Sequence, residues 1–373
     1  MPDWTKTMEQ SYEYYTVDPT TLADLKRLDN VKSASFTRDA DTETLGSASI
    51  AANNSVGETY IRGYLKTRQN GVTEKFPLGT VLVQTPSSSF DGKIMDISMD
   101  AYTPLIELKE NKPPIGYTLR KGTNIMDAAY NIIREHARVP VNQVEHVYEK
   151  DSNGVLQDIS PVISYENGFI SNTDDTWLSF VIDLIALAKY ELGLDEKGHI
   201  LFLPVQDMAA LQPVWTYDDG NSSILLPDIT IDHDLYGIPN RVEVIHSYGG
   251  QYLTAIATNE DENSPVSYKN RGRWITYRDT NPKLSVNNDD NVFVSQERLN
   301  EYAENLLHKL STIEYSVSYT HAYCPVRVGD CVRLNYEKAG ITNIKAKVIS
   351  QNIKCDLPCQ VSEKAIFTTN LWR

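Results

Sequence analysis

The chain has 373 residues, enough for two or three domains with hydrophobic cores of their own. It carries 50 Asp and Glu against 35 Lys and Arg, a formal net charge of -15 at pH 7. This acidic balance, without a run of basic residues, excludes a surface built to grip nucleic acid. No apolar run approaches the roughly 20 residues of a membrane-spanning helix, and no signal peptide is visible at the start. We therefore expect a protein that folds in a cytoplasm and has no membrane anchor.

Residues 1–112 are predicted to form an N-terminal β domain. The first thirty residues are polar and rich in tyrosine, and from Val31 onward apolar and polar residues alternate as in strands with one buried face. The predicted strands are 31–38, 45–51, 60–67, 76–84, 92–99 and 104–108. Asn70-Gly71 indicates a hairpin turn, because both residues tolerate positive φ. Short strands with frequent turns favour a sandwich or a barrel.

Residues 113–237 are predicted to form an α/β insert domain. It begins at a Lys-Pro-Pro sequence typical of a linker at 112–114. Thr123 is expected to cap a helix with apolar residues on one face between Ile125 and Ile133. A second helix is expected to begin near Asp174 or Asp175 and to end at Gly193, followed by a buried strand at 198–204.

Residues 238–373 are predicted to form a second β domain with one helix. Strands are expected at 241–246 and 252–257, and a helix has its apolar face at Leu299, Ala303, Leu306, Leu307 and Leu310. The polar runs 259–264 and 287–291 are predicted to be exposed loops. A hairpin follows at 331–336 and 344–350. The predicted fold class is α+β, mainly β, with two β-barrel or sandwich domains around an α/β insert, a layout that suggests internal duplication.

All four cysteines lie in this last part: Cys324, Cys331, Cys355 and Cys359. They are expected at strand ends, where two distant pairs can converge. Their spacings do not match the two-residue gap of zinc knuckles, whereas an iron–sulfur cluster accepts looser gaps. We predict these four residues as metal ligands, for a 4Fe-4S cluster or zinc. Disulfides formed in a mature particle and plain buried thiols are the alternatives. His321 is a further candidate ligand, although a lone histidine on a strand is more often structural.

Other motifs give little support for catalysis. We find no nucleophile elbow, no His-Glu-x-x-His and no P-loop. Asp232-His233-Asp234 is interpreted as a solvated turn, since neighbours in an extended chain point to opposite faces. Arg271-Gly272-Arg273-Trp274 is either a stacking platform for nucleic acid or sugar, or an edge strand with solvated arginines. The 22 tyrosines favour a protein of assemblies, because tyrosine is enriched at interfaces.

Two stretches of the chain, 30–50 and 238–373, resemble baseplate hub proteins of contractile-tailed phages and tail-like particles. The resemblance is carried by Val31-Lys-Ser-Ala-Ser-Phe-Thr-Arg-Asp, Leu45-Gly-Ser-Ala-Ser-Ile, Ile238-Pro-Asn-Arg-Val-Glu-Val-Ile, Tyr248-Gly-Gly, Asn270-Arg-Gly-Arg, Ser311-Thr-Ile-Glu-Tyr-Ser-Val-Ser-Tyr, Pro325-Val-Arg-Val-Gly-Asp-Cys-Val-Arg-Leu and Lys345-Ala-Lys-Val-Ile-Ser. Each of these segments is typical of a structural element, and none contains a catalytic motif.

This resemblance implies a structural virion protein of the tail baseplate, made in the bacterial host cytoplasm. Its two β domains are then tube-protein-like, so that a homotrimer presents six similar modules to a hexameric tail tube and matches a trimeric spike. The implied partners are the tail tube or tube-initiator protein, the spike protein and the baseplate wedge proteins, with DNA only in transit through the lumen. Some similar tail-tip proteins carry a four-cysteine iron–sulfur site. The acidic charge suits a bore that repels DNA, although on the charge evidence by itself solubility is the better explanation.

The sequence leaves two other functions open. One is a tail-associated cell-wall-degrading enzyme, a peptidoglycan hydrolase, for which the chain shows no block with a catalytic motif. The other is a cytoplasmic metalloprotein with redox-active cysteines. We expect a non-enzymatic hub.

Overall fold

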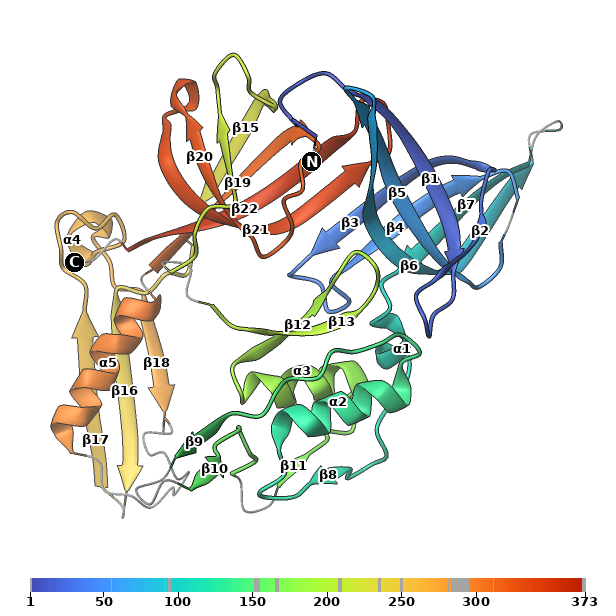
Figure 1. Ribbon diagram of the computed structural model, residues 1–373. Helices are drawn as coiled ribbons and strands as arrows, with labels where there is room; N and C mark the ends of the chain where they lie inside the picture. The colour runs from blue at the N-terminus through green and yellow to red at the C-terminus, as the bar shows by residue number, and fades with distance from the viewer. Residues whose placement is uncertain are drawn as a thin grey trace. The chain divides into compact units, whose positions relative to one another are not determined.

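The computed structural model describes residues 2–54, 56–90, 92, 95–150, 155–164, 168–206, 210–233, 236–248, 251–280, 282, 295–310 and 312–370. The chain folds into two compact units (Figure 1). The first comprises Met1–Ile229 and Tyr319–Lys364, and the second comprises Thr230–Ser318 and Ala365–Arg373. The three predicted domains, divided after residues 112 and 237, stay a prediction. The two units are defined by contacts in space, whereas the predicted domains are consecutive stretches of sequence.

A large, mostly antiparallel sheet dominates the first unit. The strands before the insert are β1 (Glu9–Val17), β2 (Asp24–Arg27), β3 (Val31–Asp39), β4 (Gly46–Ala52), β5 (Tyr60–Gln69), β6 (Val72–Phe90) and β7 (Met95–Tyr102). Those after it are β14 (Trp215–Asp218), β15 (Leu225–His233), β19 (Thr312–Ala322), β20 (Cys331–Tyr336), β21 (Ile341–Lys354) and β22 (Gln360–Asn370), with a 3-10 turn at Glu337–Ala339. The strand order is β15-β19-β22-β21-β3-β4-β7-β6-β5-β1-β2, and β20 pairs with β21 and β14. The predicted class, α+β and mainly β, is confirmed.

One strand pair joins the two β-rich regions of the sequence. β3 runs antiparallel to β21, with Phe36 opposite Ile353. Phe36 is 2% exposed, and its ring lies over two glycines, one on β5 and one on β6. A Cβ at Gly63 would come within 2.5 Å of this ring, and one at Gly79 within 3.1 Å. Strands from opposite ends of the chain therefore share one core, which requires glycine where the aromatic ring lies.

The hairpin predicted around Asn70-Gly71 is confirmed: it joins β5 and β6, with positive φ at both residues. The strand predicted at 104–108 is wrong, because this segment turns into the short helix α1 (Ile106–Lys109). Proline at position 104 cannot donate to a strand ladder, and burial of Leu105 and Leu108 favours helical spacing. The first thirty residues, for which no strand was predicted, contain β1 and β2.

The α/β insert packs against β1, β5 and β6 of the same unit through a shared hydrophobic core. Its main helices are α2 (Ile125–His136) and α3 (Trp177–Ala186). Its strands are β8 (Thr118–Leu119), β9 (Tyr148–Lys150), β10 (Leu156–Asp158), β11 (Phe169–Ile170), β12 (Tyr190–Leu194) and β13 (Ile200–Pro204), paired as three two-stranded antiparallel sheets. The core includes Tyr60 and Leu82 from the large sheet, so the insert and the sheet form one structural body.

Both helices of the insert were predicted, with errors at their ends. Asn124, not Thr123, caps α2: its side chain accepts hydrogen bonds from the backbone N–H groups of residues 126 and 127. Thr176 caps α3 in a capping box with Ser179. This helix ends at Ala186 instead of Gly193, because the chain reverses through Lys189, at φ 60°, into β12.

The second unit is built around a three-stranded sheet and a long helix. The sheet has the order β17-β16-β18, formed by β16 (Arg241–Tyr248), β17 (Gln251–Thr258) and β18 (Thr276–Thr280). The predicted helix is confirmed as α5 (Gln296–Leu310), and its apolar face covers Val242 and Val244. The predicted loop at 259–264 begins and ends at fully buried polar residues, so it is not exposed throughout. The loop predicted at 287–291 lies outside the described residues. No helix in the described ranges is long and apolar enough to cross a membrane.

Candidate functional site

The four cysteines are buried, unpaired thiols at strand ends of the first unit. Cys331 begins β20, Cys355 directly follows β21, Cys359 directly precedes β22, and Cys324 comes two residues after β19. Their predicted location at strand ends is therefore confirmed. Each has surroundings of its own, and these decide what the thiols can do.

Cys324 belongs to a buried polar network. The Tyr217 hydroxyl lies 3.3 Å from its Sγ and 3.1 Å from His321 Nε2. His321 Nε2 lies 3.3 Å from Glu363 Oε2, which also accepts a hydrogen bond from Gln351 Nε2 at 2.6 Å. Tyr319 donates its hydroxyl to the other oxygen of Glu363. These residues come from β14, β19, β21 and β22, so the network connects four strands.

The network holds His321 and Glu363 as a buried ion pair. Both side chains are 0% exposed. Burial by itself lowers the pKa of His321, but the hydrogen bonds to Cys324 and Glu363 outweigh it and raise this pKa to about 10. His321 is therefore cationic at neutral pH. Sequence reasoning considered it as a ligand, and the structure gives it a carboxylate partner instead.

Cys355 and Cys359 bracket a loop that docks on β1. The Tyr12 hydroxyl donates to the Asp356 carbonyl at 2.6 Å, and Gln10 Oε1 accepts the Cys359 N–H at 2.8 Å. Burial raises the pKa of the Cys355 thiol to about 12 and that of Cys359 to about 11, although hydrogen bonds with tyrosines of β1 oppose this rise. Both thiols are thus protonated at neutral pH. A protonated thiol is a poor nucleophile and must lose its proton to bind a metal.

Cys331 lies on β20 opposite Lys347 of β21, where Lys345, Arg333 and Asp330 act on its thiol by charge. Burial raises the pKa of its thiol. Among the described residues, no three His, Cys, Asp or Glu side chains are arranged to hold a metal ion. As placed, the four thiols do not fit one metal centre. Their role as ligands of a 4Fe-4S cluster or zinc stays a prediction.

The other motifs fall in different surroundings. Arg271 ends the short helix α4 (Tyr268–Arg271), and Gly272 caps it at φ 64°, so the edge strand expected here is wrong. Tyr268 stacks on Trp274 with a centroid distance of 4.2 Å, and Arg241 lies over the same indole at 5.8 Å. The indole therefore already has aromatic and cationic neighbours. Asp232 and His233 end β15, and Asp234 lies outside the described residues.

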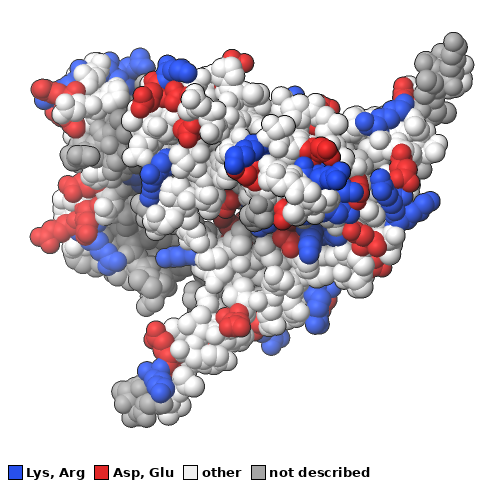
Figure 2. Space-filling view, turned by 45° about the horizontal axis from the view of Figure 1, so that its top comes forward, with Lys and Arg blue, Asp and Glu red and all other residues white. Residues whose placement is uncertain are grey.

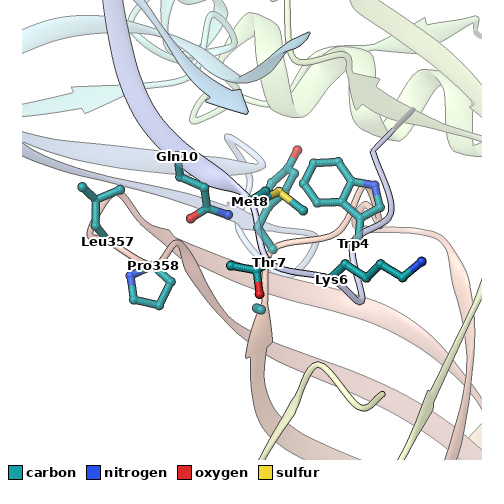
Figure 3. Close-up of a pocket in the computed structure, with 9 residues that line it drawn as sticks. Trp4, Lys6, Thr7, Met8, Gln10, Leu357 and Pro358 are labelled. Atoms are coloured by element: carbon teal, nitrogen blue, oxygen red, sulfur yellow. The ribbon is translucent and has the colours of Figure 1, made fainter. Parts of the chain in front are cut away.

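A shallow groove of the first unit was not predicted (Figure 3). It is lined by residues before and within β1, by the end of β19 and by the 355–359 loop: Trp4, Lys6, Thr7, Met8, Gln10, Ala322, Tyr323, Leu357 and Pro358. Its walls are about equally polar and apolar. Leu357 at its rim is 67% exposed. No sequence signal identifies this groove, because it forms only when the C-terminal loop packs beside the N-terminal segment. On the face that Figure 2 shows, charges of both signs are interspersed among uncharged residues.

No protein-family model and no curated protein matches the sequence. Solved structures do match in fold. A tail protein from Neisseria meningitidis is 10% identical with a TM-score of 0.60, over 96% of both chains. The 43 kDa tail protein of prophage MuSo2 from Shewanella oneidensis is 12% identical with a TM-score of 0.58, over 96% of this chain and 98% of that one.

The chain has the fold of phage tail proteins. A chain of the Francisella PdpA–VgrG complex is also similar, 8% identical with a TM-score of 0.55, over 97% of this chain and 58% of that one. The resemblance to hub proteins is thereby confirmed at the level of the fold. Sequence identity this low supports a shared fold only. The partners and the activity of this chain are therefore matters for a proposal.

Proposed function

We propose that this tail-fold protein is a structural hub of the baseplate of a phage or phage-tail-like particle. Three copies form a ring that adapts the hexameric tail tube to the trimeric spike and continues the DNA channel. The observation that carries the proposal is the likeness of fold to a tail protein over 96% of both chains. In such a ring, two similar β modules in each copy would let a trimer match a hexamer.

The same proposal implies the partners of the ring and the charge of its central channel. The Francisella neighbour is part of a complex between two different proteins, which supports assembly of this chain with a partner. In the particle, the tube or tube-initiator protein, the spike and the wedge proteins contact the ring, and DNA only passes through it. The net charge of -15 keeps the bore repulsive to DNA.

Labelled particles test this proposal. Ile115 is 91% exposed, whereas the native thiols are buried, so Ile115→Cys offers one reactive site for a maleimide–gold label. Images of particles assembled with labelled protein are expected to show three labels at the baseplate end. Labels along the tail, or none on the particle, would overturn the proposal. A zymogram on cell-wall material is expected to show no clearing, and a clear zone would instead support the hydrolase function.

A further inference from the structure

Three cationic side chains lie together on one face of the hairpin formed by β20 and β21. Arg333 of β20 is directly opposite Lys345 of β21, and Cys331, two residues before Arg333, is opposite Lys347. Residues opposite each other in an antiparallel pair share a face of the sheet, as do residues two apart on one strand. Val332, between Cys331 and Arg333, is 0% exposed, so the three cations lie on the face opposite to this core residue. We call Arg333, Lys345 and Lys347 the cationic cluster.

The cationic cluster lacks acceptors that would satisfy it. Like charges directly opposite each other destabilise a strand pair. Lys345 Nζ donates to the Leu211 carbonyl at 3.1 Å, which uses one of its three N–H groups. The guanidinium of Arg333 forms no hydrogen bond and no ion pair with any described residue, and its Nε is buried. Arg333 therefore has donors for an acceptor that the described part of the chain does not supply.

Nearby carboxylates neutralise only part of this charge. Glu191 of β12 lies 3.9 Å from Lys347 Nζ, and its side chain is 50% exposed. Asp218 and Asp330 accept hydrogen bonds from backbone N–H groups close to them in sequence. Neither of these two forms an ion pair with the cationic cluster within the described ranges. Three cations against one carboxylate leave an excess of two positive charges, in a chain whose net charge is -15.

This excess matches a phosphate dianion. A phosphate group with one ester bond or none carries close to two negative charges at neutral pH and presents several acceptor oxygens. A planar guanidinium binds such oxygens through two parallel N–H groups, and lysine ammonium groups add point charges. A carboxylate, or a phosphodiester of a nucleic-acid backbone, carries one charge and would leave the excess half neutralised. All three side chains of the cluster are half-buried, which suits one compact anionic group better than an extended polymer.

We propose that Arg333, Lys345 and Lys347 bind a phosphate dianion, either as inorganic phosphate or as the phosphomonoester group of a larger ligand. The phosphate oxygens accept the unpartnered N–H groups of Arg333, and their charge offsets the repulsion between Arg333 and Lys345. Because Lys347 also faces Glu191, the site lies where the β20–β21 hairpin meets β12 of the insert. The site does not depend on the proposed hub function, since it needs only one folded chain.

Equilibrium dialysis of the full chain against radiolabelled inorganic phosphate tests the site, at about pH 7.5 and constant ionic strength. We expect saturable binding of one phosphate per chain, and Arg333→Gln is expected to weaken it by at least about tenfold. Arg68→Gln is the matched control: it removes one positive charge from the same unit, at a side chain that is 62% exposed, and should bind as the wild type does. No saturable binding, or equal weakening in both variants, would overturn the proposal.

Competition identifies the charge that the site selects. Methyl phosphate, a dianion, is expected to displace the labelled phosphate, which would support a ligand that carries a phosphomonoester. Dimethyl phosphate and acetate carry one charge each and should need at least about tenfold higher concentrations. Competition by dimethyl phosphate at the same concentration as methyl phosphate would contradict a site for a dianion.

Thermal unfolding gives a second readout that does not require equally stable variants. Phosphate is expected to raise the unfolding midpoint of the wild type and of Arg68→Gln, because a ligand that binds only the folded state stabilises it. The midpoints of Arg333→Gln and Lys345→Met should not respond to phosphate. Each protein is compared with itself at the same ionic strength, so a change in its basal stability does not matter. A rise of equal size in all four proteins would show a general effect of the salt and count against the site.

Discussion

Arg62 donates a hydrogen bond from Nη2 to the Lys197 carbonyl, with an N–O distance of 2.6 Å. Arg62 is on β5, whereas Lys197 lies in the turn between β12 and β13 of the insert. The same guanidinium also donates to the Leu22 carbonyl, to Asp24 and to Thr80. Its side chain is 3% exposed. One buried cation therefore connects the insert to the large sheet.

Arg62→Met is expected to lower the free energy of unfolding by roughly 3 to 5 kcal/mol, because it leaves several buried acceptors unpaired. Urea denaturation followed by tryptophan fluorescence measures this change. Arg68→Met, on the same strand and with a 62% exposed side chain, is the matched control and should stay within about 0.5 kcal/mol. Equal losses in both variants would show that the buried bonds do not hold the insert.

The His321–Glu363 pair predicts a pH dependence of stability. The pKa of His321 is raised from its ordinary value of 6.5 to about 10 in the folded chain. A raised pKa contributes stability that is fully present below pH 6.5 and is lost as the pH rises toward 10. Urea midpoints of the wild type are expected to fall between pH 6.5 and 8.5, while those of His321→Gln fall less. Parallel profiles in the two proteins would contradict the ion pair.

The sequence predicted the elements better than their connections. Alternation identified β3, β4, β5 and β6, and the spacing of Leu299, Ala303 and Leu307 identified α5, because each pattern reports one buried face. No local pattern indicates that β3 pairs with β21, more than 300 residues later in the chain. The first thirty residues were missed as strands because the tyrosines of β1 do not read as an apolar face.

In the candidate site too, local features were predicted and long-range contacts were not. Strand ends were predicted for the four cysteines and are confirmed, since local alternation places them there. The environment of the thiols was not predictable, because Tyr12 reaches Cys359 and Tyr217 reaches Cys324 from distant parts of the chain. A cysteine count alone therefore does not distinguish a ligand from a buried thiol.

The thiols are expected to react slowly in the native protein. Burial and raised pKa values at Cys355 and Cys359 disfavour the thiolate, which is the reactive form. With DTNB at pH 8 the folded chain should show little reaction, and the unfolded chain should show four thiols. Leu357→Cys, at a 67% exposed position in the same loop, should add one rapidly reacting thiol. Fewer than four thiols after unfolding would indicate disulfides, and iron or zinc released on unfolding would support the metal-site prediction.

Two glycines with positive φ allow the cost of a steric clash to be compared with the cost of backbone strain alone. A Cβ at Gly46, with φ at 135°, would lie 2.1 Å from the Thr37 carbonyl oxygen across the β3–β4 pair, whereas one at Gly57, with φ at 70°, meets nothing within 4 Å. We expect Gly57→Ala to cost about 1 kcal/mol from backbone strain alone. Gly46→Ala is expected to cost more, about 2 to 3 kcal/mol, because the strands must also separate. Urea unfolding of both variants measures the difference, and a smaller loss for Gly46→Ala would mean that the β3–β4 pair yields without cost to the shared sheet.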